Sequence, residues 1–119
     1  MSKLTQTVQS GDWKSEKHVP EIEVVREGEK LNIKVEVGSE IEHPNTLEHH
    51  ISWIKVFFQA EDGKFPVEVG SYDFQAHGED EILSVPSVSA SIKTAKNGTV
   101  YALSYCNIHG LWENSVEVK

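Results

Sequence analysis

Hydrophobic and polar residues alternate along much of this chain, with a period of two. Residues 31–37 place Leu, Ile, Val and Val at every second position, with Asn, Lys and Glu between them. A strand with one face in a protein core has this pattern, because successive side chains point to opposite faces. Alternation or β-rich composition predicts further strands over residues 21–25, 67–74, 87–93, 101–106 and 115–118.

Glycine-containing turns separate several of these runs. They are Glu27-Gly28-Glu29, Asp62-Gly63 and Asn97-Gly98, and the last two are typical of hairpin turns with a positive φ. We therefore expect neighbouring strands to pair antiparallel. About seven short strands, with no segment of helical period, predict an all-β fold, an immunoglobulin-like antiparallel β-sandwich; a small barrel is the alternative.

Residues 51–60 differ because both faces of the expected strand are apolar. Ile51, Trp53 and Phe57 fall on one face, and Ile54, Val56 and Phe58 fall on the other. Such a strand is either covered by a loop on its outer side or contributes to a subunit interface. The second possibility predicts a homo-oligomer.

Length and composition limit the classes of function. The 119 residues suit one domain, residues 1–119, that begins with a polar segment, residues 1–15. The 19 acidic and 11 basic residues give a net charge of −8, which disfavours nucleic acid as a partner. Cys106 is the single cysteine, so an intramolecular disulfide is excluded. Without a signal peptide or an apolar run of membrane-spanning length, we expect a soluble, cytoplasmic protein.

The candidate chemistry lies in three clusters. They are Glu16-Lys17-His18, the segment from His43 to His49-His50, and Cys106-Asn107-Ile108-His109-Gly110. Four histidines and one cysteine exceed the four ligands of a closed structural zinc site, and they favour a redox metal with an open position. Each cluster alone is weak evidence, because a lone cysteine is commonly a small core residue and surface histidines are commonly solvated. For the two remaining histidines, His50 and His77, we expect supporting or solvated roles.

The local sequence suggests how the clusters are presented. Cys106 ends an expected strand and His109 follows in a short turn, so both side chains can face one point. The spacing of His43 and His49 is wrong for one helix face and places both on a loop before the strand at Ile51. His18 precedes Val19-Pro20, where proline favours extended geometry.

Together the three clusters resemble superoxide reductase, in its small one-iron form, neelaredoxin, which is similar to the catalytic domain of desulfoferrodoxin. The matching motifs are Glu16-Lys17-His18-Val19-Pro20, His43-Pro44-Asn45 with His49-His50-Ile51-Ser52-Trp53-Ile54, and Cys106-Asn107-Ile108-His109-Gly110-Leu111-Trp112. The motifs span residues 16–112, and their order and spacing are far more specific than any one of them.

The resemblance implies an immunoglobulin-like sandwich with one mononuclear iron per chain. Its ligands would be four equatorial histidines and an axial thiolate, namely His18, His43, His49, His109 and Cys106. The activity implied is the one-electron reduction of superoxide to hydrogen peroxide. A rubredoxin-like protein would donate the electron, and the chain would form a homotetramer.

Glu16 and Lys17 would complete the site. By resemblance, Glu16 occupies the sixth iron position in the resting ferric state and leaves on reduction, which is a gating role. Lys17 would attract the superoxide anion and help deliver a proton. We also expect the backbone amides of residues 107–109 to donate hydrogen bonds to the Cys106 sulfur.

Three other functions compete with this interpretation. A blue-copper electron-transfer protein also combines a sandwich with Cys and His ligands, but it uses two histidines and commonly a methionine, and Met1 is the only methionine here. A non-catalytic binding module would not require the three clusters on one domain. Superoxide dismutation is the nearest enzymatic rival.

Overall fold

The computed structural model describes residues 3–12 and 18–119. Two short 3-10 turns and seven strands follow one another along the described chain. They are η1 (Leu4–Gln6), β1 (Glu21–Glu27), β2 (Lys30–Glu36), β3 (Ile51–Ala60), β4 (Val67–Asp73), η2 (Glu79–Glu81), β5 (Ser87–Lys93), β6 (Gly98–Cys106) and β7 (Gly110–Val118). Among the described residues, no helical segment is long and apolar enough to cross a membrane.

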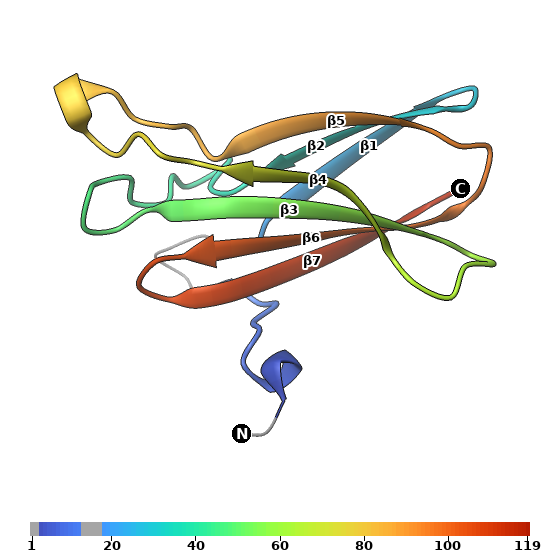
Figure 1. Cartoon of the computed structure of the whole chain (residues 1–119), viewed down its shortest axis with the longest axis horizontal. Helices are drawn as coiled ribbons and strands as arrows, with labels where there is room; N and C mark the ends of the chain where they lie inside the picture. The colour runs from blue at the N-terminus through green and yellow to red at the C-terminus, as the bar shows by residue number, and fades with distance from the viewer. Residues whose placement is uncertain (1–2, 13–17) are drawn as a thin grey trace.

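The strands form two antiparallel sheets, with orders β1-β2-β5 and β4-β3-β6-β7. Figure 1 shows the sheets lying face to face. The pairs β1-β2, β3-β4 and β6-β7 are hairpins, whereas the links after β2, β4 and β5 cross between the sheets. This alternation between two packed layers confirms the predicted immunoglobulin-like β-sandwich and excludes a single closed barrel.

Every predicted strand is present and the turn at Asp62-Gly63 lies in the β3–β4 hairpin, but the positive φ predicted for two glycines was wrong. Gly63 and Gly98 do not have a positive φ, and the link at Asn97-Gly98 joins strands of different sheets rather than a hairpin. Gly98 is required for a different reason. A Cβ atom there would overlap the carbonyl oxygen of Gln59 on the neighbouring strand β3.

The two faces of β3 also differ from the prediction. Ile51 is buried together with Ile54, whereas Trp53 is only half-buried on the outer face. The register between β3 and β6 is irregular between Ile51 and Trp53. This irregularity, which the alternation of residue types does not reveal, turns Ile51 towards the core.

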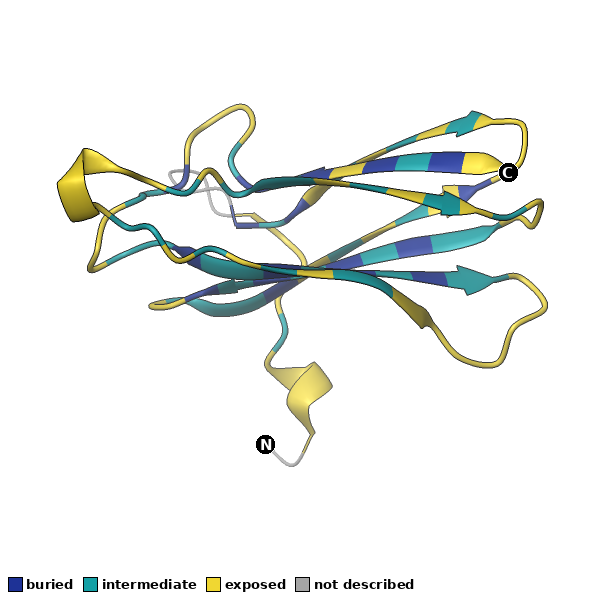
Figure 2. Cartoon of the chain, turned by 45° about the horizontal axis from the view of Figure 1, so that its top comes forward, coloured by how far each residue is buried: buried dark blue, intermediate teal, exposed yellow. Residues whose placement is uncertain are grey.

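Buried residues recur along strands of both sheets (Figure 2), and their side chains form the core. Its buried apolar members are Leu31, Ile33, Val35, Val37, Ile51, Ile54, Val56, Phe58, Val100, Ala102, Cys106 and Val118. In β6 the buried positions are residues 100, 102, 104 and 106. The large side chains at 101, 103 and 105, which dominate the pattern in the sequence, therefore lie on the outer face.

Antiparallel pairing brings several segments to one end of the sandwich. The start of β1 pairs with the end of β2, and the start of β3 pairs with the end of β6. The segment before β1, the β2–β3 loop and the β6–β7 turn therefore meet at this end, and we call it the site end. Four of the five predicted iron ligands lie on these three segments, and the fifth, Cys106, is the last residue of β6 at the same end.

Candidate metal centre

His18 closes the site end of the core and is fully buried. Its backbone N–H and that of Val19 both donate to Oδ1 of Asp12, at 2.6 Å and 2.8 Å. The hydroxyl of Ser104 donates to the His18 carbonyl oxygen at 3.2 Å. The His18 ring stacks on Trp112, with ring centroids 4.4 Å apart and planes 13° apart. These contacts hold both the backbone and the ring plane of His18.

A tight fold of the β2–β3 loop places His43. Gly38 has a φ of +83°, and a Cβ atom there would lie 2.6 Å from the His43 backbone nitrogen. The His43 Nδ1 atom lies 2.6 Å from the carbonyl oxygen of Pro44. Because a carbonyl only accepts, Nδ1 carries the proton, and Nε2 is the nitrogen suited to a metal. Histidines that bind metals commonly donate their second ring N–H in this way.

The second half of the loop places His49. Thr46 donates its backbone N–H to the His49 carbonyl oxygen at 2.9 Å, and its hydroxyl accepts the His49 N–H at 3.1 Å. The buried Nε2 atom of His49 has no hydrogen-bond partner among the described residues. A buried ring nitrogen without a partner is costly unless something absent from the polypeptide binds it.

Cys106 and His109 are placed by strand β6 and the turn that follows it. Cys106 occupies the last inward position of β6 and is fully buried. Gly110, with a φ of +83°, ends the turn and begins β7. The His109 N–H donates to the Cys106 sulfur at 3.4 Å, and His109 Nδ1 lies 3.8 Å from the same sulfur.

The amide of Asn107 does not bind the sulfur, so this part of the prediction was wrong. The Asn107 N–H donates instead to the carbonyl oxygen of His50, at 3.1 Å. Among the residues 107–109, the contact from the His109 amide to the sulfur is the one observed.

The four imidazoles form a closed ring of edge contacts. Neighbouring centroids are 4.6 Å apart for His18 and His43, 4.8 Å for His43 and His49, 5.0 Å for His49 and His109, and 5.1 Å for His109 and His18. The planes of each pair are inclined by 74° to 89°. Ligand atoms of His18, His49, Cys106 and His109 all lie within 4.8 Å of one another.

This donor set fits a transition metal. Imidazole and thiolate are the ligands that iron, zinc and copper prefer, whereas magnesium and calcium prefer oxygen. Four inclined imidazoles in a closed ring, with a thiol beside them, could together hold one such ion. The structure thus brings together the five predicted ligands from segments that are remote in the sequence.

The other two predicted site residues, Glu16 and Lys17, lie outside the described residues. His50 and His77 stack on each other, with ring centroids 3.4 Å apart. Sequence reasoning missed the roles of Asp12 and Ser104 beside His18, because a single Asp or Ser has no distinctive pattern. The role of Trp112, which stacks on His18, could have been predicted, because Trp112 belongs to the motif that contains Cys106 and His109.

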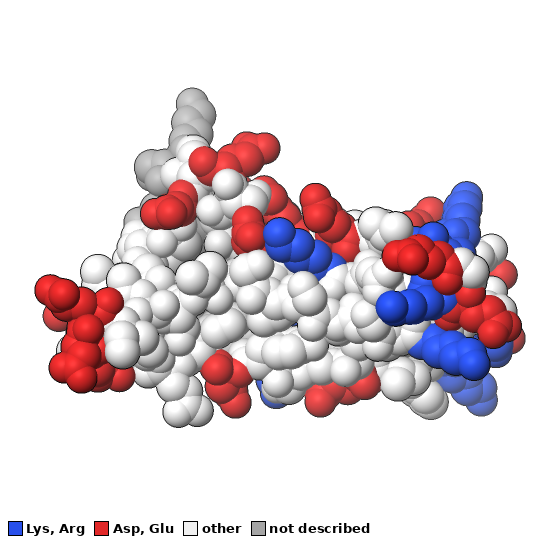
Figure 3. All heavy atoms as spheres, turned by 90° about the horizontal axis from the view of Figure 1, so that it is seen from above, with Lys and Arg blue, Asp and Glu red and all other residues white. Residues whose placement is uncertain are grey.

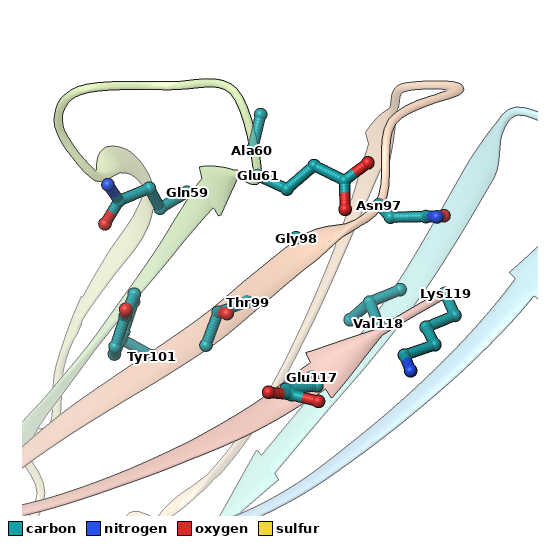
Figure 4. Close-up of a pocket in the computed structure, with 10 residues that line it drawn as sticks. All are labelled: Gln59, Ala60, Glu61, Asn97, Gly98, Thr99, Tyr101, Glu117, Val118 and Lys119. Carbon is teal, nitrogen blue, oxygen red and sulfur yellow. The ribbon is translucent and has the colours of Figure 1, made fainter.

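Two hollows in the surface can be compared with the cluster. One, of about 670 Å³, lies at the site end beside His43, between the β2–β3 loop and residues 83–86. The other, of about 460 Å³, lies at the opposite end between Gln59, Asn97 and Lys119 (Figure 4). The second contains none of the clustered ligands, so the candidate chemistry belongs to the site end.

Comparisons with known proteins agree with this geometry. The desulfoferrodoxin family model matches residues 10–115. A superoxide reductase of Pyrococcus abyssi is 54% identical over 98% of this chain and 99% of its own length. A neelaredoxin of Megalodesulfovibrio gigas is 44% identical over 98% of this chain and 97% of its own.

A solved structure shows the same fold. A crystal structure of a superoxide reductase in the oxidized state superposes with a TM-score of 0.96 at 50% identity, covering 98% of this chain and all of that one. The match extends over both sheets and all the segments that carry the clustered ligands. The chain therefore belongs to the desulfoferrodoxin family.

Proposed function

We propose that this protein is a superoxide reductase, which reduces superoxide to hydrogen peroxide with one electron and two protons. The reaction takes place at one mononuclear iron per chain, held by His18, His43, His49, His109 and Cys106. The observation that carries the proposal is the closed ring of four imidazoles beside a buried thiol. The family membership and the full-length match to superoxide reductases support it.

The donor set suits an anionic substrate. Iron, when bound, supplies the electron and an open position for a small anion. Four neutral imidazoles add no charge and the thiolate adds one negative charge, so a ferrous site keeps a net positive charge. The chain places the Cys106 sulfur beside the imidazoles, within 3.8 Å of His109 Nδ1, so all five groups could hold one ion together.

The hydrogen bond from the His109 amide moderates the donation by the sulfur. An N–H that points at a thiolate stabilises the negative charge on the sulfur. The bond at 3.4 Å is part of the β6–β7 turn, so its geometry is set by the fold.

Lys17 is proposed to steer superoxide to the site. The β2–β3 loop and residues 74–86 carry exposed carboxylates at 40, 42, 48, 79, 80 and 81, and no Lys or Arg. Figure 3 shows acidic side chains at the end with η2, whereas Lys and Arg gather at the opposite end. A cation adjacent to His18 in sequence would counter this field over the Debye length of roughly 8 Å at physiological salt. Lys17→Ala should slow the encounter and flatten its salt dependence; an unchanged rate at low ionic strength would exclude steering.

Glu16 is proposed to occupy the open position in the resting ferric state and to leave on reduction. Glu16→Ala should therefore change the ferric spectrum and keep fast superoxide reduction. Loss of activity in this variant would contradict a gating role.

The blue-copper alternative is not favoured by the site. A blue-copper centre uses two histidines with the cysteine and a weak axial ligand. Four histidine rings in one closed cycle exceed that requirement.

An external reductant must supply the electron, since the single iron would be oxidised at each turnover. The chain has one cysteine, which is part of the proposed site, and therefore none for a second cysteine-bound centre. A rubredoxin-like donor, as the family resemblance implies, is our proposal. A reduced thiol also suits the cytoplasm, where we place the protein.

We further propose that residues 1–119 act as one domain and assemble as a homotetramer. The outer face of the four-stranded sheet supports assembly, because it carries large apolar side chains across three neighbouring strands. They are Trp53 and Phe57 on β3, Tyr101, Leu103 and Tyr105 on β6, and Leu111 on β7. Sedimentation should show a tetramer, and Leu103→Glu should dissociate it; a wild-type monomer at micromolar concentration would exclude assembly.

The ligand proposal is tested with Cys106→Ser. Wild-type ferrous protein should be oxidised by a superoxide pulse, and a thiolate-to-iron absorption band should appear. The variant should lack this band even when iron is bound by the histidines. An unchanged band would show that the sulfur is not a ligand.

A further inference from the structure

The side chain of Asn107 connects the loop that carries His49 to the turn between Cys106 and His109. Its Oδ1 atom accepts the backbone N–H of His50 at 2.8 Å, and its Nδ2 atom donates to the carbonyl oxygen of Glu48 at 3.0 Å. The Asn107 backbone N–H adds a third bond, to the His50 carbonyl oxygen, at 3.1 Å. Asn107 therefore makes two side-chain bonds and one backbone bond to the loop that carries His49.

These bonds hold the loop on both sides of His49. Glu48 and His50 are its immediate neighbours, so the peptide groups that flank His49 are tied to the turn between Cys106 and His109. Without them, the position of the His49 ring relative to the sulfur would depend on two loops that extend separately from different strands. Hydrogen bonds that do not involve the metal itself can orient its ligands in this way.

We propose that Asn107 is a positioning residue that sets the placement of His49 relative to Cys106 and His109. The inference rests on the proposed metal centre and deepens it. Asn107 does not touch the metal. It acts through the two loops, and it keeps the β6–β7 turn in the conformation that directs the His109 amide at the sulfur.

The loop that carries His49 has other attachments that do not involve Asn107. The His50 ring stacks on His77, and His50 Nδ1 lies 2.9 Å from the Thr46 carbonyl oxygen. Thr46 closes the loop with two further bonds to His49. A variant at Asn107 should therefore fold, with a loosened relation between the two loops rather than an unfolded loop.

Two variants separate the two side-chain bonds. Asn107→Ala removes both of them and keeps the backbone bond to His50. Asn107→Asp keeps an acceptor for the His50 N–H and loses the donor to Glu48. Asn32→Ala is the matched control, because Asn32 bonds Glu27 and Ser91 on the sheet β1-β2-β5, far from the site end.

The first readout uses the metal-free protein. Exchange of the His50 amide hydrogen should be roughly tenfold faster in Asn107→Ala, which lacks its acceptor, and close to wild type in Asn107→Asp. If His50 exchange is the same in Asn107→Ala and wild type, the proposed tie between the loops is refuted.

The second readout uses the metal-loaded protein. Cobalt(II) or iron should dissociate roughly tenfold faster from Asn107→Ala, and the thiolate-to-metal band should shift, while Asn32→Ala matches wild type. A wild-type band and dissociation rate in Asn107→Ala would overturn the inference while leaving the proposed function intact. Wild-type protein that binds metal without a thiolate band would instead overturn the proposed function.

Discussion

Gly38 offers a sharp test of how the fold positions a ligand. In Gly38→Ala, the new Cβ atom would lie 2.6 Å from the His43 backbone nitrogen and 3.1 Å from the Ile41 carbonyl oxygen. Ordinary van der Waals contacts of Cβ atoms begin at 3.4 Å, so the His43 backbone must move by about 0.8 Å. Metal sites tolerate deviations of only about 0.2 Å in ligand distance.

The energetic cost has two parts. A non-glycine residue in the left-handed region costs about 1–2 kcal/mol, and a steric overlap inside a packed loop costs about 1–3 kcal/mol. Gly38→Ala should therefore destabilise the protein by about 2–5 kcal/mol. At about 4 °C per kcal/mol for a domain of this size, Tm should fall by roughly 8–20 °C.

Gly28→Ala separates these contributions. Gly28 has a φ of +63° and nothing within 4 Å of the added Cβ atom, and it lies in the β1–β2 hairpin at the opposite end. This control should lose only about 1–2 kcal/mol and should keep wild-type metal affinity. Gly38→Ala should bind iron or cobalt(II) about 10–100-fold more weakly.

Thermal unfolding of the metal-free proteins and metal competition titrations measure the two effects. The reasoning would be refuted if the two glycine variants lost equal stability and both retained wild-type metal affinity. In that case the close approach of Gly38 to His43 would have no part in placing the ligand.

Further predictions concern the packing around the site and the opposite end of the sandwich. Trp112→Ala should cost about 3–5 kcal/mol in denaturant unfolding and weaken metal binding, because His18 loses the ring on which it stacks; wild-type affinity would contradict this role. Arg26 donates to the carbonyl oxygens of Gly28, Thr94, Lys96 and Lys119. Arg26→Ala should therefore cost about 1–2 kcal/mol of stability and leave the spectrum of the metal centre unchanged. A change in that spectrum would show unexpected coupling between the two ends of the sandwich. The hydrogen bond and charge of Lys96 lower the pKa of Asp62. The resulting stabilisation is present above the unfolded pKa of about 3.9 and is lost as pH falls through the lower folded pKa. Any loss of stability that Asp62→Asn shows at pH 7 should therefore disappear in acid.

Much of the fold could be predicted from alternation alone. Strand β2 shows regular alternation because one face is buried and the other is solvated, and this contrast is what the sequence records. In strand β6 the alternation gives the strand but not its buried face, because the outer face carries Tyr101, Leu103 and Tyr105, while the inner face includes the small residues Ala102 and Ser104. Apolar residues at alternate positions show that one face of a strand is apolar, but they do not show whether that face turns towards the core.

The site was predictable only in part. Its five candidate ligands could be predicted because imidazole and thiol groups are rare and the three motifs are specific. The supporting contacts of Asp12, Ser104 and Asn107 use common residues, and they depend on backbone groups that become neighbours only after folding. The redirected amide of Asn107 shows the same limit, because the competing acceptor, the His50 carbonyl, lies on another loop.

The central claim, that the site reduces superoxide and does not dismutate it, is tested by product yield. Ferrous protein would be mixed anaerobically with a limiting superoxide pulse, and hydrogen peroxide and oxygen would both be measured. We predict one peroxide for each superoxide consumed, one iron oxidised in the process, and no oxygen evolved. Half a peroxide and half an oxygen per superoxide, with the iron still ferrous at the end, would contradict the account.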